Sequence, residues 1–116
     1  AAKATGLYEE TLDLNAVTKE ADFLYTDTWI DMEFFHEEHY KEEKARRIDL
    51  LTPYQINEAL LGHSNAYVMH CLPAHRGEEI TDVILDGDRC LVYEQAENRL
   101  HSQKAILERT MLAPRS

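Results

Sequence analysis

The sequence predicts an α/β fold with three layers, in which a truncated parallel sheet of about three to four strands lies between helices. Two observations predict it. Short apolar runs alternate with helical patterns along the 116-residue chain, and strands separated by helices are typical of parallel sheets. A parallel sheet needs cover on both faces. We therefore expect the sheet to continue in residues that this sequence does not contain.

The first third of the chain contains one clear strand pattern. Residues 21–26 form a short apolar run, as expected of a buried strand. Before it, residues 1–15 lack a strong pattern and fit the end of a helix followed by a strand around residues 12–14. After it, residues 34–49 are rich in Glu, Lys and Arg, which predicts an exposed helix or a helical loop.

A second helix is predicted over residues 52–62. Thr52 suits the N-cap, Pro53 suits the first helical position, and Gln55 lies three residues after the cap. Apolar side chains at positions 56, 60 and 61 give this helix one apolar face, and Gly62 can end it.

Strand and helix patterns alternate through the rest of the chain. Residues 66–70 and 90–93 are apolar runs that predict strands. Between them, the residues from about 81 to 86 predict a short helix that Gly87 ends. A helical pattern runs from residue 96 to about residue 112.

Composition excludes several classes of partner. The chain has 12 basic and 22 acidic residues, and a net charge of −10 does not favour nucleic acid. No apolar run approaches the roughly 20 residues that span a bilayer, so we expect no membrane partner, and no secretion signal opens the chain. Cys71 and Cys90 form neither a CxxC pair nor a dense framework, which predicts reduced thiols in a cytoplasmic protein.

Two reactive side chains follow predicted strands. Cys71 follows the strand at 66–70, and Asp27 follows the strand at 21–26. Open α/β sheets bind ligands at the carboxyl ends of their strands, and a carboxylate there can hold an ammonium group or orient a thiol. The alternatives are that Cys71 is a buried small residue and that Asp27 caps a helix or lies in a loop.

Arg99 is the third candidate, near the start of the last predicted helix. A guanidinium group matches phosphate and carboxylate oxygens at two points, and the helix dipole slightly disfavours a cation in the first turn. The alternative is a structural ion pair with Glu94 or Glu97. His36 and His39 could share a helix face, but a solvated charged face is favoured over a metal site, so we expect no metal.

Four segments together resemble the ornithine carbamoyltransferases, and the similarity runs over residues 17–107. Aspartate carbamoyltransferases are less similar, because they lack the cysteine that follows the histidine. The segments are Thr-Asp-Thr-Trp at 26–29, Tyr-Gln-Ile-Asn at 54–57, His-Cys-Leu-Pro-Ala-His-Arg-Gly-Glu-Glu at 70–79, and Glu-Gln-Ala-Glu-Asn-Arg at 94–99.

The resemblance implies that residues 1–116 are a partial C-terminal, Rossmann-like, ornithine-binding domain. The family transfers a carbamoyl group from carbamoyl phosphate to the side-chain amine of ornithine, giving citrulline and phosphate in arginine biosynthesis or catabolism. It implies no metal or cofactor, and a homotrimer or a multiple of it for the full-length protein.

The resemblance also implies roles for single residues. Asp27 matches the residue that contacts the ammonium end of the amino acid, and Cys71 matches the thiol beside the reacting groups. Leu72 offers its backbone carbonyl to the ligand, with a cis bond to Pro73. Arg99 matches the arginine that reaches the oxygens of carbamoyl phosphate. Direct attack of the amine in a closed site requires no covalent intermediate on the thiol.

The chain departs from the family pattern in two places. The Ser-Thr-Arg-Thr and His-Pro-x-Gln segments of the N-terminal carbamoyl phosphate domain do not occur in it, so we expect the chain alone to be inactive. Asp31, Met32 and Glu33 stand where the family has Ser-Met-Gly. Asp31 can pair with an α-ammonium group, and we expect Asp31 and Met32 to contact the substrate.

Three alternatives stay open from the sequence. The acceptor is another amine, such as putrescine or an N-acylated ornithine, because the substrate loop differs. The chain is a non-catalytic interaction module derived from the enzyme fold, because the phosphate-binding segments are missing. The chain is a cytosolic metal-binding fragment that uses His36 and His39.

Overall fold

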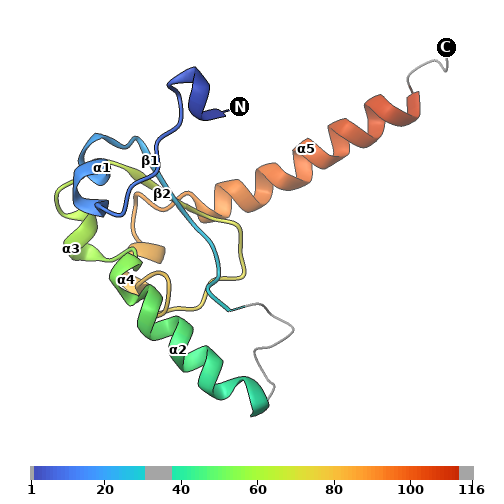
Figure 1. Ribbon diagram of the computed structural model, residues 1–116. Helices are drawn as coiled ribbons and strands as arrows, with labels where there is room; N and C mark the ends of the chain where they lie inside the picture. The colour runs from blue at the N-terminus through green and yellow to red at the C-terminus, as the bar shows by residue number, and fades with distance from the viewer. Residues whose placement is uncertain (1, 31–37, 113–116) are drawn as a thin grey trace.

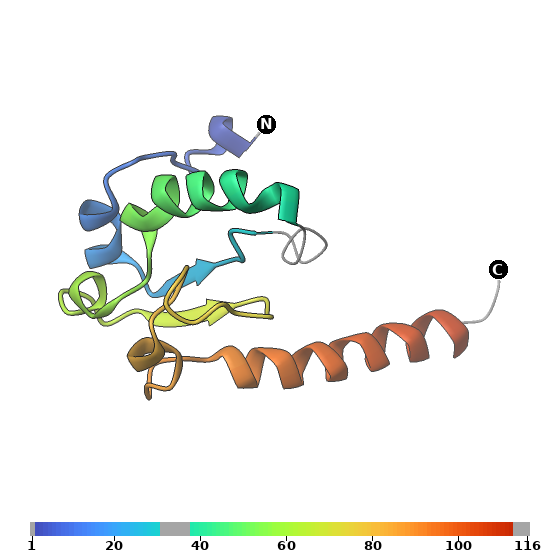
Figure 2. The ribbon, with the colours of Figure 1, turned by 90° about the horizontal axis from the view of Figure 1, so that it is seen from below.

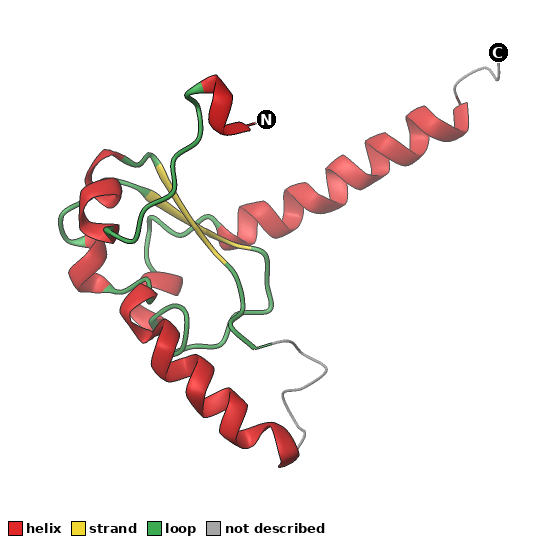
Figure 3. Ribbon diagram, in the orientation of Figure 1, coloured by secondary structure: helices red, strands yellow, loops and turns green. Residues whose placement is uncertain are grey.

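The computed structural model describes residues 2–30 and 38–112, which form an α/β arrangement with a parallel sheet, as predicted (Figures 1 and 3). The strands are β1 (Phe23–Thr26) and β2 (Tyr67–His70). The helices are α1 (Leu14–Glu20), α2 (Lys41–Leu51), α3 (Glu58–Leu61), α4 (Asp82–Leu85) and α5 (Val92–Leu112), with short 3-10 turns at Ala2–Thr5, Glu38–Tyr40 and Thr52–Tyr54.

The two strands run in the same direction, with Phe23 opposite Tyr67 and Thr26 opposite His70 (Figure 2). A third segment touches β2 at one point only. The Val68 N–H donates to the carbonyl of Arg89, and the Leu91 N–H donates to the carbonyl of Val68, each at 2.8 Å.

The predicted strand at 90–93 is therefore wrong in extent. Cys90 forms an isolated bridge with Val68, and α5 already begins at Val92. The apolar run Cys-Leu-Val-Tyr is compatible with the first turn of a partly buried helix as well as with a strand, and periodicity cannot separate the two in so short a run.

Two other local predictions are also corrected. Leu14 begins α1 where a strand was expected, because the Asp13 carboxylate accepts the Ala16 N–H at 3.1 Å and so caps a helix. Thr52 does not cap a new helix. Its hydroxyl donates to the Ile48 carbonyl at 2.7 Å, at the end of α2. The N-cap of α3 is Asn57, which accepts the Leu60 N–H at 3.0 Å.

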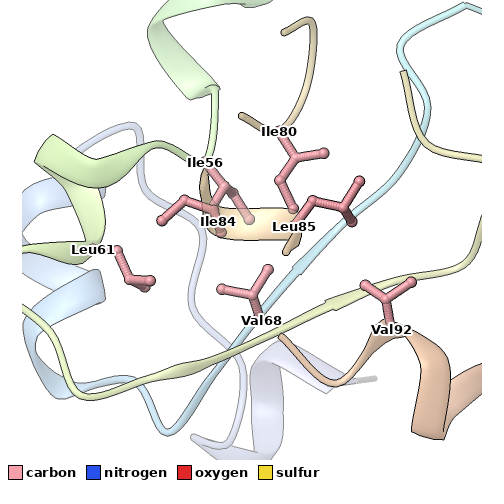
Figure 4. Packing of buried hydrophobic residues seen from close by; sticks show 7 residues of the cluster. All are labelled: Ile56, Leu61, Val68, Ile80, Ile84, Leu85 and Val92. Carbon is pink, nitrogen blue, oxygen red and sulfur yellow. The ribbon is translucent and has the colours of Figure 1, made fainter. Parts of the chain in front are cut away.

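The core is small and lies against the face of β2 that carries Val68 (Figure 4). It joins side chains from α3, α4, β2, the start of α5 and the loops between them. Its buried members are Ile56, Leu61, Val68, Ile80, Ile84, Leu85 and Val92.

The opposite face of the sheet and most of α5 are exposed. Phe23, Tyr25 and Tyr67 remain 57%, 59% and 46% exposed, although parallel sheets are ordinarily covered on both faces. Residues 96–112 of α5 are all exposed, and the helix runs away from the rest of the described chain (Figures 1 and 2). Within 2–30 and 38–112, no helix combines the length and apolarity needed to cross a bilayer.

Candidate functional site

The register of the sheet brings together two residues that the sequence singled out separately. Thr26 pairs with His70, so Asp27 and Cys71 each lie one residue past the paired strand ends. The Cys71 thiol donates a hydrogen bond to Asp27 Oδ1, with Sγ and Oδ1 2.7 Å apart. Cys71 is a free, half-buried thiol, and Asp27 is exposed.

The contact shifts the two pKa values in opposite directions. Asp27 Oδ1 also accepts the Thr28 N–H at 2.7 Å and the Thr28 hydroxyl at 3.1 Å. The hydrogen bond from Cys71 and those from Thr28 lower the pKa of the Asp27 carboxyl. Partial burial, followed by the hydrogen bond to the Asp27 carboxylate and its charge, raises the pKa of the Cys71 thiol. At neutral pH the pair is therefore a carboxylate and a neutral thiol.

Leu72 lies in an unusual turn directly after the thiol. The Leu72–Pro73 peptide bond is cis, as the resemblance implied, and Leu72 has a φ of 59°. The Leu72 N–H donates to His70 Nδ1 at 2.8 Å. The role of the Leu72 carbonyl toward a ligand stays a prediction.

The structure adds two buried groups that the sequence reasoning gave no role. His70 and Glu79 have fully buried side chains, with His70 Nε2 3.1 Å from Glu79 Oε1. Both lie in the 70–79 segment that carries the resemblance. No local signal in the sequence indicated this pair, because it depends on the path of the loop between the two residues, although buried charged groups are ordinarily partnered.

Gln95, in the first turn of α5, forms hydrogen bonds to residues at the ends of both strands. Its Oε1 accepts the His70 N–H at 3.1 Å, and its Nε2 donates to the Tyr25 hydroxyl at 3.0 Å. Arg99 lies one helical turn further along the same face, about 6 Å along the axis. Within the described chain, Arg99 pairs with neither Glu94 nor Glu97, which removes the ion-pair alternative there.

Asp31, Met32, Glu33 and His36 lie outside the described residues. The predicted substrate contacts of Asp31 and Met32, and the metal alternative at His36 and His39, therefore stay predictions.

One group of side chains has donors close enough to hold a metal ion. Ligand atoms of His75, Glu78 and Glu79 lie within 4.8 Å of one another. Glu79 Oε1 already accepts the His75 N–H at 2.5 Å, besides its contact with His70. Lys44 Nζ lies 3.3 Å from Glu78 Oε1 and supplies a positive charge. These contacts describe a hydrogen-bonded turn, and we assign it no metal.

The sequence matches a known family over nearly the whole chain. The sequence pattern described as "Aspartate/ornithine carbamoyltransferase, Asp/Orn binding domain" matches residues 1–110. The chain is 53% identical over 92 residues to the ornithine carbamoyltransferase of Haloquadratum walsbyi, covering 79% of this chain and 29% of that protein. It is 49% identical over 117 residues to the one from Hyperthermus butylicus, covering 98% of this chain and 35% of that protein.

A solved structure gives the same result. The chain is similar to ornithine carbamoyltransferase from Pyrococcus furiosus, with a TM-score of 0.77 and 40% identity, over 99% of this chain and 36% of that one. The sequence thus spans about a third of the length of the relatives that it matches.

Proposed function

The chain belongs to the aspartate/ornithine carbamoyltransferase family, and on that premise we propose that it forms the acceptor-binding part of an ornithine carbamoyltransferase. In this reaction the side-chain amine of ornithine attacks the carbonyl carbon of carbamoyl phosphate. The bond between that carbon and the phosphate oxygen breaks, and citrulline and phosphate are released.

The hydrogen bond between Cys71 and Asp27 is the observation that carries this proposal. It lies at the carboxyl ends of both strands, where open α/β sheets bind ligands. It also presents a carboxylate that can hold an ammonium group next to a neutral donor. Both features suit a primary amine that must be oriented before it attacks.

The pKa shifts refine what each group contributes. A carboxylate with a lowered pKa binds an ammonium group better than it removes its proton, so Asp27 orients the acceptor. A thiol with a raised pKa is a poor nucleophile at neutral pH. We therefore assign Cys71 a hydrogen-bonding role beside the reacting amine, in agreement with direct attack.

Arg99 and Leu72 complete the proposed set. The guanidinium of Arg99 suits the oxygens of carbamoyl phosphate and the negative charge that develops on its carbonyl oxygen. The Leu72 carbonyl suits an amine donor of the ligand. The remaining contacts to carbamoyl phosphate belong, in this proposal, to an N-terminal domain of a full-length protein that is a homotrimer or a multiple of it. The isolated chain is accordingly expected to be inactive.

An NMR titration of the chain with ornithine tests the acceptor site directly. We expect shifts confined to the surroundings of Asp27 and Cys71, and loss of those shifts in Asp27→Asn. Asp22→Asn is the matched control, because Asp22 precedes the same strand at its other end. No response to ornithine by the unchanged chain, or an equal response in Asp27→Asn, would contradict the proposal for this chain.

Putrescine and an N-acylated ornithine are the second candidates, because Asp31 and Glu33 replace Ser and Gly of the family's loop. The same titration with these amines ranks the acceptors. The double change Asp31→Ser with Glu33→Gly is expected to shift the ranking toward ornithine. An unchanged ranking would place the specificity outside this loop.

A further inference from the structure

The turn that follows Cys71 is connected to the protein interior by a chain of hydrogen bonds. The Leu72 N–H donates to His70 Nδ1 at 2.8 Å, so Nδ1 is the accepting nitrogen and carries no proton. The proton of the neutral ring is therefore on Nε2, which lies 3.1 Å from Glu79 Oε1 and donates to it. Glu79 thus selects the tautomer that can receive Leu72.

Glu79 is itself fixed by the backbone around it. Its carbonyl accepts the Ile56 N–H at 2.9 Å, and its Oε1 accepts the His75 N–H at 2.5 Å. Gln55 Nε2 donates to the carbonyls of Gly77 and Glu78 at 3.0 and 2.7 Å. The backbone of residues 77–79 is therefore fixed by residues 55 and 56, and the carboxylate itself by the His75 N–H.

The turn needs such support from outside. Leu72 has a φ of 59°, in the left-handed region that side chains other than glycine's rarely adopt, and residues in that conformation persist when their surroundings hold them. The Leu72 N–H is held by His70 Nδ1. Moving the ring proton to Nδ1 would place two N–H groups against each other and release the turn.

We propose that Glu79 and His70 are positioning residues of the acceptor site. By fixing the Nε2–H tautomer, Glu79 makes His70 hold the Leu72 turn, and the turn sets the Leu72 carbonyl and the Cys71 thiol. The inference rests on the proposed function for its consequence in ligand binding. Its structural part, the link from Glu79 through His70 to Leu72, is independent of any ligand.

A purely structural pair would behave differently. Burying two polar groups without their partners is costly, so any change at either residue lowers stability. Only a positioning role predicts that the turn follows one ring nitrogen and not the other. Asn and Gln separate the two, since an Asn Oδ1 takes the place of Nδ1 and a Gln amide takes the place of Nε2.

The experiment measures the ligand-free chain first. Long-range 1H–15N spectra of His70 in the unchanged protein are expected to show a proton on Nε2 and none on Nδ1. Observation of the Nδ1–H tautomer would overturn the proposal without any variant. The Leu72 amide resonance and the titration of the Cys71 thiol are then compared across variants.

Four variants carry the prediction. His70→Asn and Glu79→Gln retain an acceptor for Leu72 and for His70, so we expect a near-native Leu72 amide shift. His70→Gln removes the acceptor for Leu72, and Glu79→Ala removes the acceptor for His70. In both variants we expect a changed Leu72 amide chemical shift, a changed pH titration of the Cys71 thiol, and ornithine binding that is about tenfold weaker. Leu61→Ala is the control: it lowers stability from the same core but should leave the Leu72 resonance in place.

The outcomes separate this inference from the proposed function. If the unchanged chain does not respond to ornithine, the acceptor assignment fails for this chain, and the Leu72 and Cys71 signals still decide the positioning role. If His70→Gln keeps the Leu72 signal while His70→Asn loses it, the order is reversed and the proposal is wrong. If Leu61→Ala and Glu79→Ala change the Leu72 resonance and the Cys71 titration equally, His70 and Glu79 contribute to stability only.

Discussion

The Cys71 thiol and the Asp27 carboxylate control each other's protonation. The hydrogen bond and the negative charge of Asp27 both raise the pKa of the thiol, in addition to its burial. Removing the charge with Asp27→Asn should therefore lower the pKa of Cys71. We expect faster alkylation of Cys71 by iodoacetamide at a given pH near neutrality, because the thiolate is the reactive form.

Cys90 serves as the internal control for this measurement. Burial raises the pKa of its thiol, and Cys90 meets the sheet through a backbone bridge to Val68. Its alkylation rate should not respond to Asp27→Asn. An unchanged Cys71 rate, measured by mass spectrometry of the two peptides, would show that burial alone sets the Cys71 pKa.

The same pair predicts how stability depends on pH. The folded-state pKa of Asp27 lies below its ordinary value of 3.8, so its contribution is present above that value and is lost as the pH falls. The folded-state pKa of Cys71 lies above its ordinary value of 9.0, so its contribution is present below that value and is lost as the pH rises. We expect the free energy of unfolding of the double variant Asp27→Asn with Cys71→Ser, measured in urea, to depend less on pH below 3.8 and above 9.0 than that of the unchanged chain. A profile parallel to that of the unchanged chain would exclude the pair as a source of pH dependence.

At the scale of secondary-structure elements, two short helices begin at side-chain caps. Asn57 Oδ1 accepts the Leu60 N–H at 3.0 Å at the start of α3. We expect Asn57→Ala to lower the free energy of unfolding by about 1 kcal/mol, the usual cost of a lost N-cap. Urea unfolding measures this.

Asn15→Ala is the matched control for the cap. Asn15 is exposed within α1 and is not its cap, which is Asp13. Alanine is also the better helix former there. If both variants lose stability equally, the cap at Asn57 contributes nothing beyond the loss of a polar side chain.

The elements differ in how far the sequence predicts them. The strand predicted at 66–70 and the short helix predicted before Gly87 are confirmed as β2 and α4, because a mostly apolar run and a glycine just after a helix are local signals. The predicted helix start at Thr52 is wrong. Threonine is a common N-cap residue, but the Thr52 hydroxyl donates to the Ile48 carbonyl of the preceding helix. A hydroxyl group can do either, and only the path of the preceding helix decides.

The candidate site divides in the same way. Its polar residues at the strand ends follow from the position of each strand, so Asp27 and Cys71 could be predicted one at a time. Their contact could not be derived from local pattern, because it depends on the register between β1 and β2. The buried partnership of His70 with Glu79 depends likewise on the path of the loop between them.

At the scale of the whole molecule, α5 contributes unevenly to stability. Val92 is its buried residue, and residues 96–112 are exposed. Ending the chain after Leu100 should therefore change the free energy of unfolding by less than about 0.5 kcal/mol. Leu61→Ala, a deletion inside the core, should cost about 2–5 kcal/mol.

Hydrogen exchange gives a second measurement of the same feature. An isolated helical segment of this length is marginal in water, so amide protection should fall along α5 after about residue 100. Uniform protection along α5, together with a large loss of stability on truncation, would mean that the exposed segment is covered by a second copy of the chain in solution.

The parallel register also determines when the proposed site forms during folding. The Cys71 and Asp27 side chains are 44 residues apart in the chain, and the strand pairs share that separation. Helices form within microseconds, whereas contacts across long loops wait for the chain to close on itself. The thiol therefore acquires its carboxylate partner only when the sheet is made. The rate at which Cys71 becomes resistant to alkylation during refolding therefore measures the rate at which β1 and β2 pair.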